Sequence, residues 1–342
     1  MNIRRLGRSG LKVSELSLGT WTTIGGSVDR AEAIPIIRRA FELGVNLFDT
    51  ADIYSGGKAE EVLGEALADL PRDEVIVATK CMRQVWPGPN GGGLSRKHIF
   101  AALDRSLMRL KVDYVDLYQL HAPDPDTPIE ESVRAFEDLV RSGKVRYVGY
   151  SNYDAEAPPD ARKILEFQNE RGFDLMVSSQ PRWNLIDRHI EKEHLALCRK
   201  WGVGLLVYSP LAQGVLTNKY AGGARPDGTR AASRFGKFME TEKMLTPETV
   251  AAAERFAAWV TKRGIGSPAQ VALAWVLKHP EVASVLVGAA SVAQLEENLK
   301  AGELMFTEGD WREVEAAIAG RVPAKERQKQ KPKPVGRVLA KR

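Results

Sequence analysis

Cysteine, long apolar runs and a leader sequence are scarce or missing in this chain of 342 residues. Two cysteines, Cys81 and Cys198, are too few for a disulfide framework and suit a reducing compartment. No stretch of about 18 uncharged apolar residues occurs, so we expect no membrane span. The first ten residues carry three arginines but lack the apolar stretch of a secretory signal. We therefore expect a cytoplasmic protein.

The signatures of two kinds of binding site are also missing. No G-x-G-x-x-G motif follows a predicted strand and opens a helix. Gly202-Val203-Gly204 precedes a strand, which is the wrong context for a Rossmann phosphate turn. His189 and His194 are five residues apart, which on a helix separates them by about 140°. They would not chelate one metal ion, and we predict no metal site.

The positive charge of the chain is confined to its C-terminal tail. Residues 324–342 carry a net charge of +7, so the formal net charge of +5 leaves −2 for the rest. Pro332 and Pro334 interrupt any helix there, and few apolar residues could order the segment. We therefore predict one domain at 1–322 and a basic tail at 323–342. We expect a tail that is solvated or packed at an interface. No aromatic residue lies among these charges, so we expect no nucleic-acid partner. The alternative is an arm that binds nucleic acid or an acidic partner.

Eight short apolar runs alternate with segments of helical period. The predicted strands are Leu16–Leu18, Val45–Phe48, Val75–Thr79, Tyr114–Leu120, Val145–Gly149, Leu175–Ser178, Gly204–Tyr208 and Ser284–Val287. The predicted helices are 31–43, 59–69, 95–110, 128–141, 160–171, 189–201, 247–263 and 291–301. This alternation predicts parallel strands with helices outside, and eight units predict closure into a (β/α)8 TIM barrel of the α/β class.

Two further features surround the predicted barrel. The turn-rich start, Arg4 to Lys12, predicts a small N-terminal β-hairpin that plugs the barrel bottom. The longest break, at about 212–246, follows strand seven and is rich in Gly, Arg and Lys. Loops that follow barrel strands line the active-site face, so we expect this long loop to be functional.

Four polar side chains lie where three consecutive predicted strands end. Asp49 ends the second strand and Tyr54 follows it in the loop, Lys80 ends the third strand, and His121 ends the fourth. A single such Asp or Lys is usually a solvated charge. Because the ends of parallel strands meet on one face of a barrel, we expect these four side chains to converge.

The motifs around these residues resemble the aldo-keto reductase superfamily. They are the D-T-A-x-x-Y segment that ends at Tyr54, the E-x-x-x-G that follows at 60–64, the Thr79-Lys80 pair and the Leu120-His121 pair. The resemblance runs from about Ile3 to Gly320. It implies a (β/α)8 barrel, reduction of aldehydes or ketones by hydride transfer from a nicotinamide cofactor, and a catalytic set of Asp49, Tyr54, Lys80 and His121.

The chemistry of carbonyl reduction suits the roles that this resemblance implies. Hydride addition builds an alkoxide that needs a proton, and a free phenol with a pKa of about 10 is a reluctant donor. We expect the ammonium of Lys80 to lower the pKa of Tyr54, Asp49 to hold Lys80, and His121 to polarise the carbonyl. Oxidation of a hydroxylated substrate is the same reaction in reverse.

The resemblance also implies the cofactor contacts. Ser151, Asn152 and Gln180 would bind the carboxamide, and Tyr208 would stack on the nicotinamide ring unless it is a core aromatic. Ser291 and Gln294 open a predicted helix whose free amides suit a phosphate. Glu297 and Asn298, in the same predicted helix, would lie near the adenine. The remaining implied cofactor contacts are Gly19, Thr20, Trp21, Asp49, Ser209, Pro210, Leu211, Gly214 and Gly288.

The expected cofactor is NADPH or NADP+, with NADH less favoured. Many family members have a lysine where Gly288 stands, so this position does not fix a preference for NADP. Lys219 and Arg230, in the long loop, are the alternative source of positive charge for the phosphate. The expected substrate is a small carbonyl compound, in a pocket formed by Trp21, Tyr54, Trp86, His121 and Trp183, although each tryptophan could equally be core packing.

Several segments resemble one branch of the superfamily, which holds potassium-channel β subunits and bacterial L-glyceraldehyde 3-phosphate reductases. They include Trp86-Pro87-Gly88-Pro89 and the run from Pro210 to Thr217. This branch implies a homo-oligomer, commonly a tetramer. The channel β subunits have Asn in place of His121, so the histidine here favours an active reductase over the alternative, a redox-sensing binding protein with little turnover.

Overall fold

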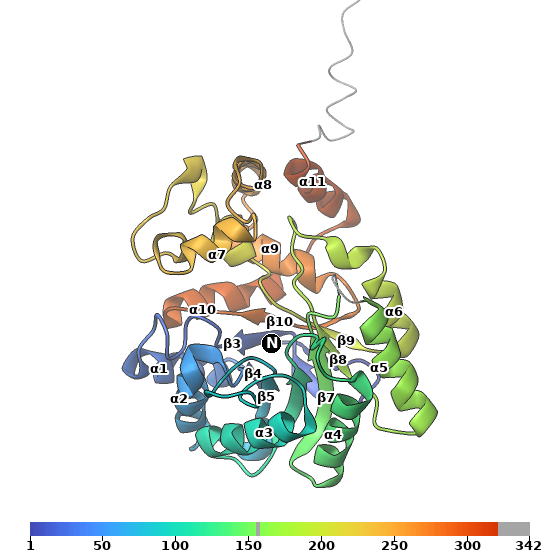
Figure 1. Ribbon diagram of the computed structural model, residues 1–342. Helices are drawn as coiled ribbons and strands as arrows, with labels where there is room; N and C mark the ends of the chain where they lie inside the picture. Colours follow the sequence, from blue (N-terminus) through green and yellow to red (C-terminus); the bar gives the residue numbers. More distant parts are fainter. Residues whose placement is uncertain (155–157, 321–342) are drawn as a thin grey trace, which may run out of the picture. The chain divides into compact units, whose positions relative to one another are not determined.

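The computed structural model describes residues 1–154 and 158–320, so the predicted basic tail at 323–342 lies outside the described residues. The chain forms two compact units (Figure 1). The first comprises residues 1–213 and 269–304, and the second comprises residues 214–268 with the segment that begins at Met305. The single domain at 1–322 stays a prediction.

The first unit contains a closed barrel of eight parallel strands, which confirms the predicted fold class. Around the barrel each strand pairs with the next along the chain, and the last pairs with the first. The strands are β3 (Leu16–Gly19), β4 (Leu47–Asp49), β5 (Ile76–Cys81), β6 (Val115–Leu120), β7 (Val145–Ser151), β8 (Ser178–Gln180), β9 (Gly204–Val207) and β10 (Val282–Val287).

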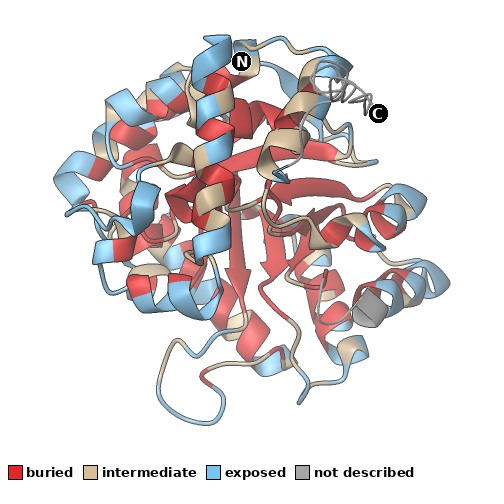
Figure 2. Cartoon of the chain, turned by 90° about the horizontal axis from the view of Figure 1, so that it is seen from above, coloured by how far each residue is buried: buried red, intermediate tan, exposed pale blue. Residues whose placement is uncertain are grey.

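Helices surround this barrel, and Figure 2 shows buried strands inside helices whose outer faces are exposed. They are α1 (Arg30–Glu42), α2 (Lys58–Leu67), α3 (Arg96–Leu110), α4 (Ile129–Arg141), α5 (Pro158–Arg171), α6 (His194–Trp201), α9 (Pro268–Leu277) and α10 (Val292–Leu299). Asp29, Ser95 and Ser291 cap the first turns of α1, α3 and α10 by accepting backbone N–H groups. Since each helix follows a strand, the loops at the carboxyl ends of the strands share one face.

A short hairpin closes the other end of the barrel, as predicted. Strands β1 (Ile3–Arg5) and β2 (Lys12–Ser14) pair antiparallel. Leu6 and Val13, from the hairpin, are fully buried in a cluster with the barrel residues Leu47, Leu117 and Leu206. The candidate site can therefore lie only at the open, carboxyl-terminal end of the strands.

The second unit is helical and holds most of the predicted long loop. That segment contains 3-10 turns and the helix α7 (Gly236–Thr241) rather than irregular chain alone. It leads to α8 (Pro247–Arg263), which packs against α11 (Glu308–Ile318). Arg263 pairs with Asp310, and the Trp259 indole N–H donates to Glu313 at 3.3 Å.

Two predictions of helices are incomplete. Helix α6 begins at His194, because residues 189–191 form a separate 3-10 turn. Helix α9 has no polar face, since Gln270 to Leu277 are all buried, so it lacks the amphipathic period by which helices are recognised.

None of the helices in the described residues is both long and apolar enough to cross a membrane.

Candidate active site

A buried ion pair lies at the carboxyl ends of β4 and β5. The ammonium of Lys80 donates to Asp49 Oδ1 at 2.7 Å and to the Thr50 carbonyl at 2.7 Å. Lys80 is 0% exposed. Successive strand residues face opposite sides, so Lys80 points into the barrel while Thr79 beside it reaches Glu60 of α2. The other Asp49 oxygen accepts from Gln180 at 2.8 Å.

The phenol of Tyr54 and the imidazole of His121 complete the cluster. Tyr54 opens a short turn, η1 (Tyr54–Gly57), in which Ser55 has a φ of 52° and Gly56 a φ of 67°. This turn brings the Tyr54 hydroxyl to 3.4 Å from Lys80 Nζ. The His121 ring lies edge-on to the Tyr54 ring, with centroids 5.6 Å apart. The structure thus brings together the four side chains that the sequence places at the ends of three strands.

Burial governs the protonation of these groups. It raises the pKa of Tyr54 well above the ordinary range, and the charges of Asp49 and Asp52 act in the same direction. The pKa of Tyr54 is therefore raised and not lowered as we expected, because desolvation of the phenolate outweighs the one opposing charge, that of Arg83. Burial also lowers the pKa of His121 well below its usual value, helped by Lys80 and Arg83, so the imidazole is neutral at neutral pH.

The residues predicted to bind the carboxamide form one hydrogen-bonded network beside this cluster. Ser151 Oγ donates to the Gln180 carbonyl at 2.9 Å. Asn152, with a left-handed φ of 62°, donates to the His121 carbonyl at 2.8 Å and accepts from the Tyr208 hydroxyl at 2.8 Å. The ends of β6, β7, β8 and β9 are therefore linked, and these side chains have fixed positions.

The predicted contacts after β3 and β9 flank the same end of the barrel. Thr20, which follows Gly19, donates its backbone N–H to the Asp49 carbonyl at 2.9 Å, and its buried hydroxyl has no partner within residues 1–154 and 158–320. Trp21 beside it is half-buried. Ser209 has a left-handed φ of 50° and is followed by Pro210 and Leu211 in the turn after β9.

The residues predicted to contact the phosphate and the adenine of the cofactor fall in two places. In the first unit, Gly288 leads to α10, where Ser291 Oγ accepts the Gln294 N–H at 3.1 Å. Of the two predicted adenine contacts, the Glu297 carbonyl accepts from Gln270 at 2.9 Å, and the buried amide nitrogen of Asn298 has no hydrogen-bond partner among the described residues.

The second unit holds Gly214, a predicted cofactor contact, together with Lys219 and Arg230, the alternative source of positive charge for the phosphate. Burial is the main cause that lowers the pKa of Lys219, and the charge of Arg230 adds to it. These two cations therefore lie close enough to repel one another.

Two of the three tryptophans predicted for the substrate pocket, Trp86 and Trp183, differ in their surroundings. The Trp86 ring lies 4.6 Å from the His98 ring of α3 between centroids, tilted by 32°, and the Arg105 guanidinium lies over the indole at 4.1 Å. Trp183 is 0% exposed, contacts Trp275 and His279, and donates to Glu191 at 3.0 Å. Trp183 is therefore a core residue, and its prediction as a pocket residue is wrong, because neighbouring rings and a carboxylate enclose the whole indole.

Three charged groups near the site were missed by sequence reasoning. Asp52 lies inside the D-T-A-x-x-Y segment, at a position where the motif specifies no residue. Arg83 is exposed three residues after Lys80 and acts electrostatically on both Tyr54 and His121. His189 bridges the loops after β7 and β8, with Nε2 at 3.0 Å from Asp154 and Nδ1 at 2.6 Å from Asp187. Only Arg83 had a usable signal, its position just beyond a strand-end lysine.

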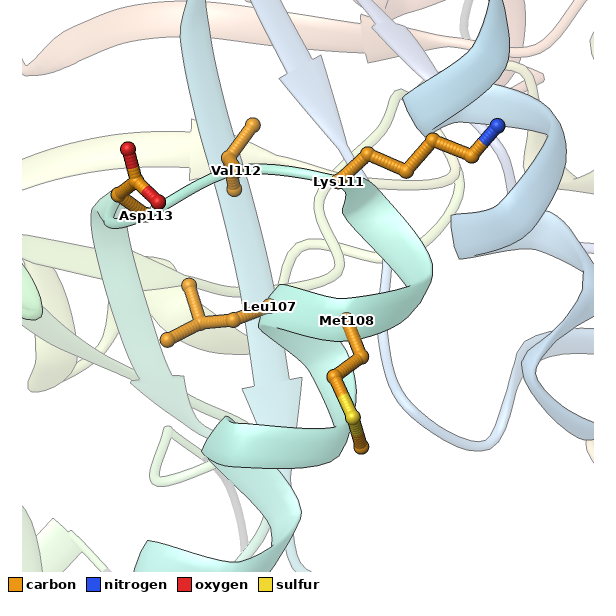
Figure 3. Close-up of a pocket in the computed structure, with 5 residues that line it drawn as sticks. All are labelled: Leu107, Met108, Lys111, Val112 and Asp113. Carbon is orange, nitrogen blue, oxygen red and sulfur yellow. The ribbon is translucent and has the colours of Figure 1, made fainter.

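Other features of the described residues lie apart from this site. No cluster of three or more His, Cys, Asp or Glu in them is arranged to hold a metal ion. Both cysteines are buried, and burial raises the pKa of each thiol. A surface depression lined by Leu107, Met108, Lys111, Val112 and Asp113 lies at the C-terminal end of α3 (Figure 3). Because that end leads into β6, the depression is at the opposite end of the barrel.

A buried Lys–Asp pair, a phenol and a neutral imidazole at the open end of a (β/α)8 barrel form a site for acid–base chemistry on a small molecule. The sequence pattern of the Aldo/keto reductase family matches residues 15–319. The chain therefore belongs to the aldo/keto reductase family and is an NAD(P)H-dependent oxidoreductase.

Curated relatives fall into two groups by name. The chain is similar to the probable voltage-gated potassium channel subunit beta of Oryza sativa subsp. japonica, at 41% identity over 306 residues, which covers 88% of this chain and 91% of that protein. It is also similar to the L-glyceraldehyde 3-phosphate reductase of Escherichia coli (strain K12), at 39% identity over 327 residues, which covers 93% of each. These relatives confirm the predicted branch of the superfamily.

Proposed function

We propose that this protein reduces aldehydes and ketones to alcohols with NADPH, and that Tyr54 protonates the oxygen of the reacting carbonyl. The observation that carries the proposal is the Tyr54 hydroxyl 3.4 Å from the buried ammonium of Lys80, beside a neutral His121. The raised pKa keeps Tyr54 protonated at neutral pH. An alkoxide is more basic than any phenolate, so a protonated Tyr54 can act as its general acid.

The other three residues prepare this proton transfer. Asp49 fixes the Lys80 ammonium, which would stabilise the phenolate that Tyr54 leaves behind. A neutral His121 can donate one N–H to the substrate oxygen without competing for the proton. Its Nδ1 is buried and unpartnered among the described residues, so this hydrogen bond would cost it no existing partner.

The residues around the site fit a nicotinamide dinucleotide. When bound, that cofactor supplies the hydride that reduces the carbonyl carbon. Asn152, Ser151 and Gln180 would orient its carboxamide, and Tyr208 would lie against the ring. The buried Thr20 hydroxyl and the Asn298 amide nitrogen, both without partners in the described part of the chain, are groups that a polar ligand would satisfy.

We propose NADPH over NADH because of Lys219 and Arg230. The charge of Arg230 lowers the pKa of Lys219, and a doubly charged phosphate would relieve this repulsion between the two cations. The preference is tested by measuring KM and binding for both cofactors with one aldehyde. We also propose a cytoplasmic location and assembly into a homo-tetramer. Analytical sedimentation would test the assembly.

Arg83 favours a substrate that carries an anionic group. It is an exposed cation at the mouth of the site, and it has no ion-pair or hydrogen-bond partner among the described residues. Its charge reaches Tyr54 and His121, between which the carbonyl would lie. A phosphorylated aldehyde, the kind of substrate in the name of the Escherichia coli relative, meets this requirement; small or aromatic neutral aldehydes form the broader class.

The alternative function is a redox-sensing binding protein with low turnover, which the names of the channel-subunit relatives suggest. The His121 imidazole beside Tyr54 favours the reductase. The two functions differ in turnover, so the test is steady oxidation of NADPH with a panel of neutral and phosphorylated aldehydes. Tight NADPH binding without oxidation by any aldehyde would favour the binding protein.

A further inference from the structure

The carboxyl group of Asp52 is buried near the Lys80–Asp49 pair. Its backbone N–H donates to the Lys80 carbonyl at 3.2 Å, and the residue is 2% exposed. Neither carboxyl oxygen has a hydrogen-bond partner in the described part of the chain. The backbone N–H of Ile53 lowers the pKa of the Asp52 carboxyl, but this effect is smaller than that of burial, which raises it. A buried carboxyl without partners requires an explanation.

The cations around Asp52 are already paired with other carboxylates. Lys80 of β5 is paired with Asp49 at 2.7 Å, and Arg109 of α3 is paired with Glu60 of α2 at 2.7 Å. Glu60 also accepts the Thr79 hydroxyl at 2.6 Å. Two cations and two carboxylates therefore balance, and Asp52 is the surplus acid.

The remaining titratable neighbours do not supply positive charge. Cys81 of β5, Tyr118 of β6 and Tyr54 are neutral, because burial raises the pKa of each. Burial, reinforced by Glu60, raises the pKa of Asp52 to about 8, and Arg109 and Lys80 offset this only in part. Arg83, in the loop after β5, acts on Tyr54 from the exposed side.

We infer that Asp52 is a positioning residue for the proposed reduction: it is neutral in the working enzyme, and its ionisation weakens Tyr54 as a proton donor. The inference rests on the proposed function. An ionised Asp52 would place a negative charge beside the phenolate that Tyr54 becomes after it gives up its proton. The alkaline limb of the pH–rate profile would then report Asp52, although this group never touches the substrate.

The test compares pH profiles of kcat for aldehyde reduction at saturating NADPH in the wild type, Asp52→Asn and a control, Asp73→Asn. A single group with a pKa of about 8 predicts that wild-type kcat falls about tenfold between pH 7 and pH 9. In Asp52→Asn the limb should move up by at least about one pH unit. Asp73 is exposed, so its variant should follow the wild type.

The direction of the shift separates Asp52 from Lys80. A negative Asp52 raises the pKa of Lys80, so a limb caused by Lys80 would move down, not up, in Asp52→Asn. An unmoved or lowered limb in an active variant overturns the inference alone. A wild type that reduces no carbonyl overturns the proposed function itself.

Thermal unfolding gives a second measurement that needs no turnover. A raised pKa means that the folded state holds a proton that the unfolded chain releases, so the stability this confers is lost as pH rises through about 8. The melting temperature of Asp52→Asn should therefore rise relative to the wild type between pH 5 and pH 9. A constant difference overturns the neutral state of Asp52. If the asparagine variant does not fold, Asp52→Ser gives the same comparison.

Discussion

Replacement of Tyr54 by phenylalanine separates the proton donor from the rest of the site. The change removes one oxygen and keeps the ring, whose centroid lies 5.6 Å from that of His121. The lost contact, from the hydroxyl to Lys80 Nζ, is a long one of 3.4 Å. Loss of such a hydrogen bond should change the free energy of unfolding by about 1 kcal/mol at most.

The expected effect on the rate is much larger than this. A positioned general acid contributes roughly 10²–10⁴-fold, which corresponds to about 3–5 kcal/mol of activation free energy. We therefore expect Tyr54→Phe to lower kcat for aldehyde reduction at least about 100-fold. Binding of NADPH should be unchanged, because Ser151, Asn152 and Gln180 keep their hydrogen bonds.

The assay follows NADPH oxidation, with cofactor affinity measured separately by fluorescence titration. Tyr147→Phe is the matched control, since Tyr147 packs near the hairpin at the other end of the barrel. Turnover of Tyr54→Phe near the wild-type rate would assign the proton donor to another group. A parallel loss of cofactor binding and rate would make Tyr54 a structural residue of the cofactor site.

Three further changes test the neighbouring charges. Lys80→Met should destabilise the fold by about 3–5 kcal/mol in urea unfolding, because it leaves Asp49 as a buried, unpaired carboxylate; adding Asp49→Asn should recover part of the loss. Arg83→Gln should raise KM for a phosphorylated aldehyde at least about tenfold and leave KM for a neutral one unchanged, and equal changes would remove Arg83 from substrate binding. The carboxylates of Asp154 and Asp187 raise the pKa of His189 to about 9. The stability that protonated His189 adds to the fold is therefore complete below the usual histidine pKa of about 6.5 and is lost as pH rises through about 9. His189→Gln should therefore melt below the wild type at pH 6 and equally above pH 10.

The barrel could be predicted because its signal is local and repeated. Each strand carries a short apolar run and each amphipathic helix a polar face, and this order alone defines parallel closure. The prediction failed at α9, whose buried residues from Gln270 to Leu277 leave no polar face to detect. It was also incomplete at 212–246, where 3-10 turns and α7 depend on packing rather than on period.

The candidate site was predictable in position and less so in electrostatics. Asp49, Lys80 and His121 end consecutive strands, so barrel geometry brings them together without any knowledge of side-chain packing. The pKa of Tyr54 could not be read in this way, because its direction depends on how far the phenol is removed from water. Asp52 and Glu60 are eight residues apart in sequence, and only the fold shows that Arg109 pairs with Glu60 and leaves Asp52 alone.

The direction of the proposed reaction follows from this balance of charge. Oxidation of a hydroxylated substrate requires Tyr54 as a phenolate base, and burial and the charge of Asp49 oppose that form. Reduction requires the protonated phenol, which burial and Asp49 favour while Asp52 is neutral. The folded site is therefore prepared for reduction at neutral pH, and the reverse reaction should gain only as the pH rises. Since ionised Asp52 would oppose the phenolate further, Asp52→Asn should speed alcohol oxidation at pH 9 while it extends reduction to the same pH.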